Sequence, residues 1–331
     1  MTRVFCWSTL CLALVACGED ETSTFGGSSG AVSGGGGTTG SGASGVGGFG
    51  FGGSSSNSGS GAGSSVAMYP ELWYCVDALL VLVTLDAADG SVASIQSSAI
   101  TVALDGGQTA ITMLDDGSLL ASRLSKVDNQ SHFFHFPSPP RDGSDVAPTV
   151  LGVMPDGIML EGLYTDCEGR VYGMDTGADD SSALGNRLLR FTGDVTAGDF
   201  AFDVVSDLAT ADVADIDDMS PGIDDNQITD NPGLAIDTGN IHAFDYETGS
   251  GTQVAQAGTF GIHALGGPLF TDDRSRLYVL NDAAVLFEID PVDFTSSAAL
   301  GTGPTPAAGP AGWSALAGPL TDCETGFSPP K

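Results

Sequence analysis

Basic residues are scarce in this sequence. Its 331 residues include 10 lysines and arginines against 42 aspartates and glutamates, which gives a formal net charge of −32 at pH 7. A surface of this charge repels phosphate groups, so we expect no nucleic acid partner. Divalent cations are its natural counter-ions, although the same charge also serves simply to keep a protein in solution. Helices should be few as well, because 48 residues are glycine.

Groups that carry catalysis are equally few. His132 and His135 are three residues apart in a predicted strand, which places them on opposite faces and makes them unsuitable ligands for one metal ion. His242 and His263 stand alone in apolar runs, where we expect structural roles. The segment 312–316 lacks the last glycine of a Gly-x-Ser-x-Gly nucleophile turn. The sequence therefore predicts no catalytic site.

The chain begins with the pattern of an export signal. Arg3 supplies the positive start, and the apolar run Val4–Val15 is shorter than the roughly 20 residues needed to span a bilayer. Small residues then lead to Cys17. Residues 1–16 are therefore predicted to be a signal peptide.

Leu14-Val-Ala-Cys17 resembles the lipobox of bacterial lipoproteins. The resemblance implies that Cys17 carries diacylglycerol on its thiol and an acyl chain, such as palmitate, on its amine. Two or more such chains hold a protein stably on a membrane. The residue after the cysteine is Gly18 and not aspartate. In the lipoprotein family this implies a cell-envelope protein that is sent to the outer membrane. An ordinary cleaved signal, which would leave a soluble secreted protein, is the alternative.

Residues 17–67 have the composition of a flexible tether. Glycine and serine dominate this stretch, and large apolar side chains are nearly absent. Such a segment cannot bury enough surface to offset the entropy lost on ordering, so we expect disorder. About 50 residues of this kind have a root-mean-square reach of roughly 40 Å.

From residue 68 onward the sequence has a repeated unit of β-rich runs and polar turns. In 267–290, a first half ends at Thr271-Asp272, and a second half contains two runs joined at Asn281-Asp282. Similar second halves are 72–86, 119–136, 171–191, 234–245 and 277–290, and similar first halves are 110–115, 159–166, 213–218, 267–272 and 318–322. The second halves end at intervals of roughly 50 residues, the length of a four-stranded propeller blade.

The unmatched halves lie at opposite ends of this region. Segment 72–86 has no first half before it, and 318–322 has no second half after it. A closed ring in which the first and last strands share one blade would produce this arrangement and would remove the open sheet edge. The prediction is an all-β propeller of about five four-stranded blades over 68–326, with 327–331 as a tail. A β-sandwich is the alternative.

The repeats resemble those of bacterial β-propellers. Leu277-Tyr278 with Ile289-Asp290, and Phe244-Asp245 with Thr248-Gly249, carry the likeness. Propellers of this sort include binding scaffolds, lactonase-like hydrolases and quinone-cofactor dehydrogenases, so the resemblance implies a shape and not an activity.

Three cysteines, Cys75, Cys167 and Cys323, lie outside the predicted signal and lipid site. In an exported protein, an odd number implies either one bridge and one free thiol or a bond to a partner outside the chain. The alignment of the repeats places Cys75 opposite Cys323 in the shared blade and predicts a disulfide between them. In the chain-entropy model, closing so long a loop contributes about 4–5 kcal/mol.

The densest group of carboxylates interrupts the fourth repeat. Calcium binds six to eight oxygens from flexible loops, and this segment could supply several of them. The candidate calcium ligands are Asp215, Asp217, Asp218, Asp224, Asp225 and Asp230. A solvated acidic insertion is the alternative. Calorimetric titration distinguishes the two, because only a metal site gives heat and a raised melting temperature with calcium.

These features together predict a lipid-anchored binding or scaffold protein of the cell envelope, with the membrane and an unknown protein or glycan ligand as partners. A calcium-dependent propeller enzyme, either a lactonase-like hydrolase or a quinone-type dehydrogenase, is the alternative. A domain that merely spaces or decorates the surface is a third hypothesis.

Overall fold

The computed structural model describes most of the region predicted to fold. The described residues are 70–103, 109–125, 128, 130–155, 157–166, 168–176, 187–207, 216–221, 233–237, 240–249, 251–256, 262–266, 276–290, 293–305, 307 and 315–318. The predicted signal peptide, lipid site and tether lie outside them. Among the described residues, no helix has the length and apolar character needed to cross a membrane.

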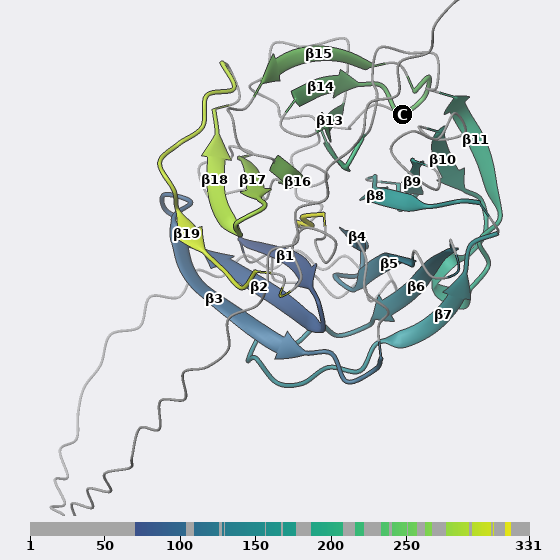
Figure 1. Ribbon diagram of the computed structural model, residues 1–331, viewed down its shortest axis with the longest axis horizontal. Helices are drawn as coiled ribbons and strands as arrows, with labels where there is room; N and C mark the ends of the chain where they lie inside the picture. The colour runs from purple at the N-terminus through teal and green to yellow at the C-terminus, as the bar shows by residue number, and fades with distance from the viewer. Residues whose placement is uncertain are drawn as a thin grey trace, which may run out of the picture. The chain divides into compact units, whose positions relative to one another are not determined.

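The chain forms a five-bladed β-propeller (Figure 1). Blade 1 contains β1 (Glu71–Val76), β2 (Leu79–Leu85) and β3 (Val92–Ala99), and blade 2 contains β4 (Thr109–Met113), β5 (Leu119–Ser125), β6 (Gln130–Phe136) and β7 (Thr149–Val153). Blade 3 contains β8 (Leu160–Thr165), β9 (Val171–Asp175), β10 (Arg187–Phe191) and β11 (Phe202–Asp207), with a short 3-10 helix, η1 (Val195–Ala197), after β10. Blade 4 contains β12 (Asp218–Pro221), β13 (Gly233–Asp237), β14 (Asn240–Phe244) and β15 (Gly251–Gln256), and blade 5 contains β16 (Ile262–Gly266), β17 (Leu277–Asn281), β18 (Val285–Ile289) and β19 (Gly301–Thr302).

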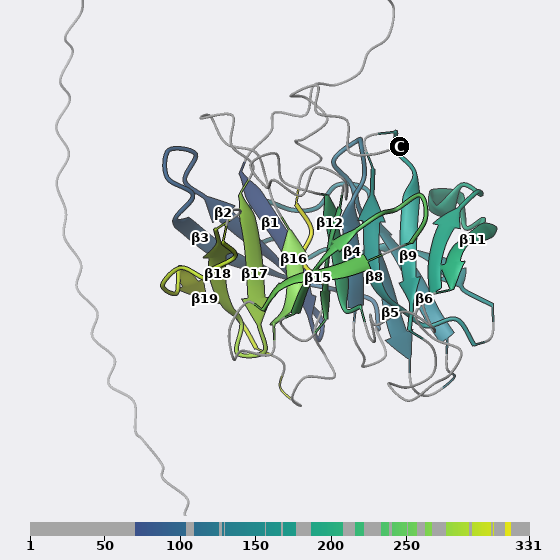
Figure 2. The ribbon, with the colours of Figure 1, turned by 90° about the horizontal axis from the view of Figure 1, so that it is seen from above.

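Neighbouring strands within each blade are antiparallel and follow chain order. Polar turns join them, as between β4 and β5, where the Asp116 carboxylate accepts a hydrogen bond from the Ser118 amide at 2.9 Å. Gly117 in this turn has a φ of 79°, which side-chain-bearing residues rarely adopt. The strands run between the two ends of the propeller, as the side view shows (Figure 2).

The hydrophobic core consists of layers between blades. Every residue of β5 is buried because one face of this strand packs toward blade 1 and the other toward blade 3. Large aromatic side chains fill these layers, and Trp73, Tyr74, Phe133 and Tyr278 are fully buried. Core packing therefore accounts for the aromatic residues that recur at the repeated strand positions.

The C-terminal segment 315–318 completes blade 1. Ala317 and Trp73 exchange two backbone hydrogen bonds of 2.8 Å, so this segment pairs antiparallel with β1. The Ala315 amide also donates to the Thr109 carbonyl of blade 2 at 2.8 Å. The prediction that the two ends of the folded region share one blade is thereby confirmed.

The repeat pattern located the middle hairpin of every blade. The five predicted second halves correspond to β1–β2, β5–β6, β9–β10, β13–β14 and β17–β18, and the first halves 110–115 and 159–166 correspond to β4 and β8.

Three predicted first halves were misplaced. Strand β12 begins only at Asp218, where the prediction ended, and β16 at Ile262–Gly266 precedes the predicted 267–272, which lies outside the described residues. The segment that closes blade 1 includes Ala317, before the predicted start at residue 318. Pairing with the neighbouring strand decides these boundaries, and short inner strands carry too few residues for a periodic signal.

Replacing Ala317 with proline should destabilise the whole propeller. Proline has no amide hydrogen, so the buried Trp73 carbonyl would lose its partner, at a cost of about 1–3 kcal/mol. A lower melting temperature than that of Ala317→Ser, which keeps the amide donor, is expected in thermal unfolding. Equal melting temperatures for the two variants would argue against closure at this position.

Candidate functional site

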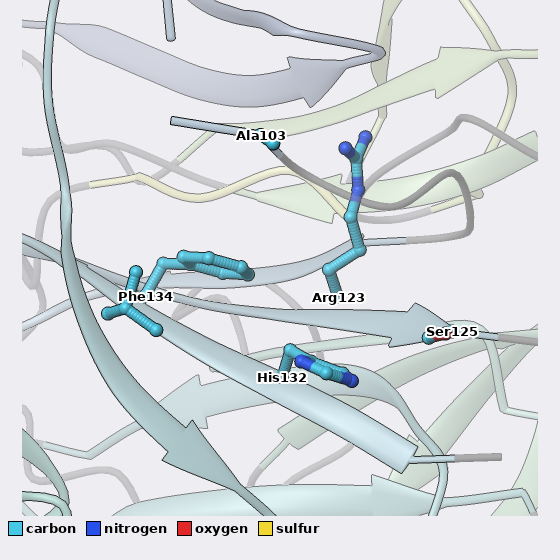
Figure 3. Close-up of a pocket in the computed structure, with 6 residues that line it drawn as sticks. Ala103, Arg123, Ser125, His132 and Phe134 are labelled. Atoms are coloured by element: carbon cyan, nitrogen blue, oxygen red, sulfur yellow. The ribbon is translucent and has the colours of Figure 1, made fainter. Parts of the chain in front are cut away.

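A cavity of about 110 Å³ lies between blade 1 and blade 2 (Figure 3). It is lined by Ala103, Arg123, Ser125, His132, Phe134 and Val150. Ala103 and Val150 are exposed, whereas Arg123, Ser125 and Phe134 are buried. The cavity therefore has a buried floor and an opening toward solvent.

The strand register brings the lining residues together. Alternate residues of a strand share a face, so Arg123 and Ser125 of β5 lie on one side of blade 2. Arg123 pairs with His132 in the antiparallel β5–β6 ladder, which places His132 and Phe134 on the same side. Val150 pairs with Phe134 from β7. This face packs against blade 1 through Phe134 and Trp73.

Arg123 connects the two blades beside the cavity. Its side chain is 2% exposed. Its Nε donates to Thr109 Oγ1 at 3.2 Å, and its Nη2 donates to the Asp77 carbonyl in the β1–β2 turn at 2.7 Å. The arginine thus holds a buried positive charge at a fixed position at the blade interface.

His132 is the most exposed of the polar residues that line the cavity. Its Nε2 lies 2.8 Å from Asp128 Oδ2, and its side chain is 27% exposed. Phe134 and Val150 add an apolar wall, and Ser125 adds a hydroxyl. Few polar groups at defined positions against an apolar wall are typical of a small-ligand site.

The other described histidines have different surroundings. His135 Nε2 lies 2.9 Å from Ser118 Oγ, away from the cavity, so the predicted separation of His132 and His135 is confirmed. His242 on β14 is 3% exposed, and neither ring nitrogen has a hydrogen-bond partner among the described residues. Nothing is described of the His263 side chain.

Two of the predicted calcium ligands are described, and both are buried. Asp218 Oδ1 accepts from the Met219 amide at 2.8 Å, and its Oδ2 accepts from the Leu316 amide at 3.0 Å. This carboxylate therefore fixes the closing segment, a role that no local sequence signal could reveal because Leu316 is distant in the chain. Asp217 lies beside it.

The remaining predicted ligands, Asp215, Asp224, Asp225 and Asp230, lie outside the described residues. Within the described part of the chain, no group of three or more histidine, cysteine, aspartate or glutamate side chains could hold a metal ion. The calcium site stays a prediction.

Cys75 on β1 is 1% exposed. Burial raises the pKa of its thiol to about 12, against the opposing charge of Arg123. Because Trp73 pairs with Ala317, the antiparallel register places Ala315, not residue 323, opposite Cys75. Cys167 and Cys323 both lie outside the described residues, so the disulfide stays a prediction. The strand register on which that prediction was based differs from the register of the closing segment.

The sequence patterns did not predict the buried ion pairs. Glu71, which is 3% exposed, accepts two hydrogen bonds of 2.8 and 2.6 Å from Arg141, which comes from blade 2. Fully buried Asp175 accepts from Arg187. Buried Asp166 pairs with Arg170, four residues away across a turn, and this short spacing could have predicted the contact.

The comparisons with known proteins concern the fold. No protein-family model matches the chain, and no curated protein matches it. Solved structures do match. A chain of a nidogen/laminin complex is 10% identical, with coverage of 76% of this chain and 99% of that chain and a TM-score of 0.43. An auxiliary nutrient binding protein from Bacteroides thetaiotaomicron is 12% identical, with coverage of 70% and 57% and a TM-score of 0.39.

A protein of unknown function from Bacteroides caccae is 8% identical, with coverage of 70% of this chain and 72% of that chain and a TM-score of 0.35. At such identities and TM-scores the likeness carries no argument about function. The blades and their closure themselves define the chain as a five-bladed β-propeller protein.

His242 should make the stability of the protein depend on pH. Burial lowers the pKa of His242 below its ordinary value of 6.5, so the unfolded chain binds the proton at a higher pH than the folded chain does. The free energy of unfolding should therefore fall as pH drops below about 6.5. In His242→Leu, the melting temperature should decline less between about pH 7.5 and about pH 5 than in the unmodified protein. Parallel declines would contradict this assignment.

Proposed function

We propose that the protein is a lipid-anchored binding protein of the bacterial cell envelope, in which the cavity between blades 1 and 2 receives part of a ligand. The observation that carries the proposal is the placement of Arg123, His132 and Phe134 on one face of β5 and β6 around this cavity. A positive group, a titratable ring and an aromatic wall together can recognise a ligand that is partly polar and partly apolar.

The rigidity of the cavity supports binding. Arg123 and Phe134 belong to the middle strands of a closed blade, and Arg123 is tied to both blades by hydrogen bonds. A preorganised site loses little conformational entropy when the ligand binds. Binding energy is then available for affinity and specificity.

The size of the cavity indicates what kind of ligand fits. Drug-sized ligands occupy pockets of about 300–1,000 Å³, so a cavity of about 110 Å³ holds only a side group of a larger ligand. A protein side chain or a substituent of a glycan would be of this size. The acidic surface as a whole disfavours a polyanion.

The N-terminal region supports placement at the envelope. Cys17 stands in a lipobox-like sequence, and the glycine- and serine-rich segment up to residue 67 would let the propeller reach roughly 40 Å from its anchor. A ligand-binding domain on such a tether can meet partners in many orientations.

Replacing Cys17 with serine should release the protein from the membrane. Serine offers no thiol to the lipid, so the variant should carry no radiolabelled palmitate, and protein that is cleaved after export is expected in the soluble fraction. Cys11→Ser, which changes a cysteine of the predicted signal outside the lipobox, is the control and should stay in the membrane fraction. Retention of labelled lipid by Cys17→Ser would contradict the anchor.

Replacing His132 with alanine should weaken binding at the cavity. A thermal-shift screen with envelope glycans and peptides should reveal ligands that raise the melting temperature of the unmodified protein more than that of His132→Ala. Asp128→Asn is a matched control, because it breaks the same ion pair but leaves the cavity lining unchanged. Equal shifts in His132→Ala and the unmodified protein would show that the ligand binds elsewhere.

A further inference from the structure

A second cavity, of about 280 Å³, lies between blade 2 and blade 3. Its lining includes Asp115, Arg170, Val171, Phe191, Asp194 and Thr196. Thr109 pairs with Arg123 at one end of the β4–β5 ladder, and Asp115 follows the other end. The second cavity is therefore at the opposite end of blade 2 from the first.

One wall of this cavity is the turn between β8 and β9. Asp166 in this turn is 3% exposed, and its carboxylate accepts from the Glu168 amide at 2.9 Å and the Arg170 amide at 2.8 Å. The same carboxylate accepts from Arg170 Nε, and Glu168 lies 3.3 Å from Arg170 Nη1. Burial lowers the pKa of Arg170, but the hydrogen bond and charge of Asp166 outweigh this effect and raise it. The guanidinium is thus charged and held in one orientation.

The turn that contains η1 also lines the cavity. Asp194 Oδ1 accepts from Thr196 Oγ1 at 2.7 Å and from the Thr196 amide at 3.0 Å. These hydrogen bonds lower the pKa of Asp194, and the one from the Thr196 hydroxyl has the largest effect. The carboxylate is therefore ionised at neutral pH. A Cβ atom added at Gly193 would lie 2.4 Å from Asp199 Cγ and would collide with it. The turn is therefore closely packed.

Asp115 of blade 2 approaches the first wall. Its Oδ2 lies 3.6 Å from the position that a Cβ would occupy at Gly169, whose φ is 76°. The Asp115 carboxylate is exposed and makes no hydrogen bond or ion pair with the described part of the chain. It is therefore available to a ligand in the cavity.

The charges around the cavity are of both signs. Asp115, Asp166, Glu168 and Asp194 outweigh the single positive charge of Arg170, which disfavours an anion. A full cation would meet the fixed guanidinium of Arg170 within the same small volume. Donors and acceptors of both kinds instead suit a neutral ligand with several hydroxyl groups.

The apolar part of the lining completes the chemistry. Phe191 and Val171 contribute carbon surface beside the polar turns. A sugar ring has hydroxyl groups at its edge and carbon–hydrogen bonds on its faces, so it can satisfy both kinds of surface at once. The volume of about 280 Å³ is close to the lower limit of small-molecule sites, about 300 Å³, and fits one such ring.

We propose that the cavity between blades 2 and 3 binds a single neutral sugar unit, with Asp115 and Arg170 as its hydrogen-bonding groups and Phe191 as its apolar wall. This inference rests on the proposed binding function only in taking the propeller as a binding domain. It requires neither the first cavity nor the lipid anchor.

Saturation-transfer NMR with the mature full-length protein tests the site. The probes are a panel of neutral monosaccharides, with choline and acetate as a cation and an anion of small size. At least one neutral sugar should receive saturation, and Asp115→Ala should weaken its binding by about tenfold or more, the effect of losing a hydrogen bond to a charged group. Circular dichroism should show unchanged folding, because Asp115 is exposed and has no hydrogen-bond partner among the described residues.

Asp282→Ala is the matched control, since Asp282 is also an exposed turn aspartate but belongs to blade 5. It should bind the sugar as the unmodified protein does, and so should His132→Ala, whose cavity is at the other end of blade 2. Saturation of choline or acetate without any sugar would overturn the ligand class. Sugar binding that Asp115→Ala leaves unchanged, or that His132→Ala abolishes, would overturn the site, and the last result would leave the first cavity supported.

Discussion

The fold depends on the pairing of segment 315–318 with β1. Without it, blade 1 would expose the backbone of its innermost strand, and the ring would have an open edge. Two reciprocal hydrogen bonds between Ala317 and Trp73 close the blade, and further bonds from Ala315 to Thr109 and from Leu316 to Asp218 tie the segment to blades 2 and 4. Since each blade is stabilised by packing against its neighbours, closure makes the stability of all five blades cooperative.

Several of the few basic residues form ion pairs with buried carboxylates. Glu71 and Asp175 are almost completely buried, and each accepts hydrogen bonds from an arginine. A buried carboxylate without its partner is strongly destabilising, because the charge has lost its water as well. The arginines therefore neutralise selected buried carboxylates, while most other acidic groups can remain solvated.

Blade 2 connects the two proposed binding sites. One face of the blade bounds the first cavity together with blade 1, and the turn after β4 bounds the second cavity together with blade 3. The two cavities differ in chemistry because the first is built on strand residues and the second on polar turns. The interfaces between blades thus contain both the hydrophobic core and the two proposed binding sites. The blades themselves are regular sheets.

The sequence by itself determined the all-β class, the middle hairpins of the blades and the sharing of one blade by both ends, since regular alternation and polar turns are local signals. It did not place β16 at Ile262–Gly266, and it gave no sign that Asp218 accepts a hydrogen bond from the Leu316 amide. Neither cavity could be predicted, because Arg123, His132 and Asp115 acquire their neighbours only when separate strands and blades come together. Tertiary structure decided the sites because they lie between blades, where the spacing of residues along the chain carries no information about distance.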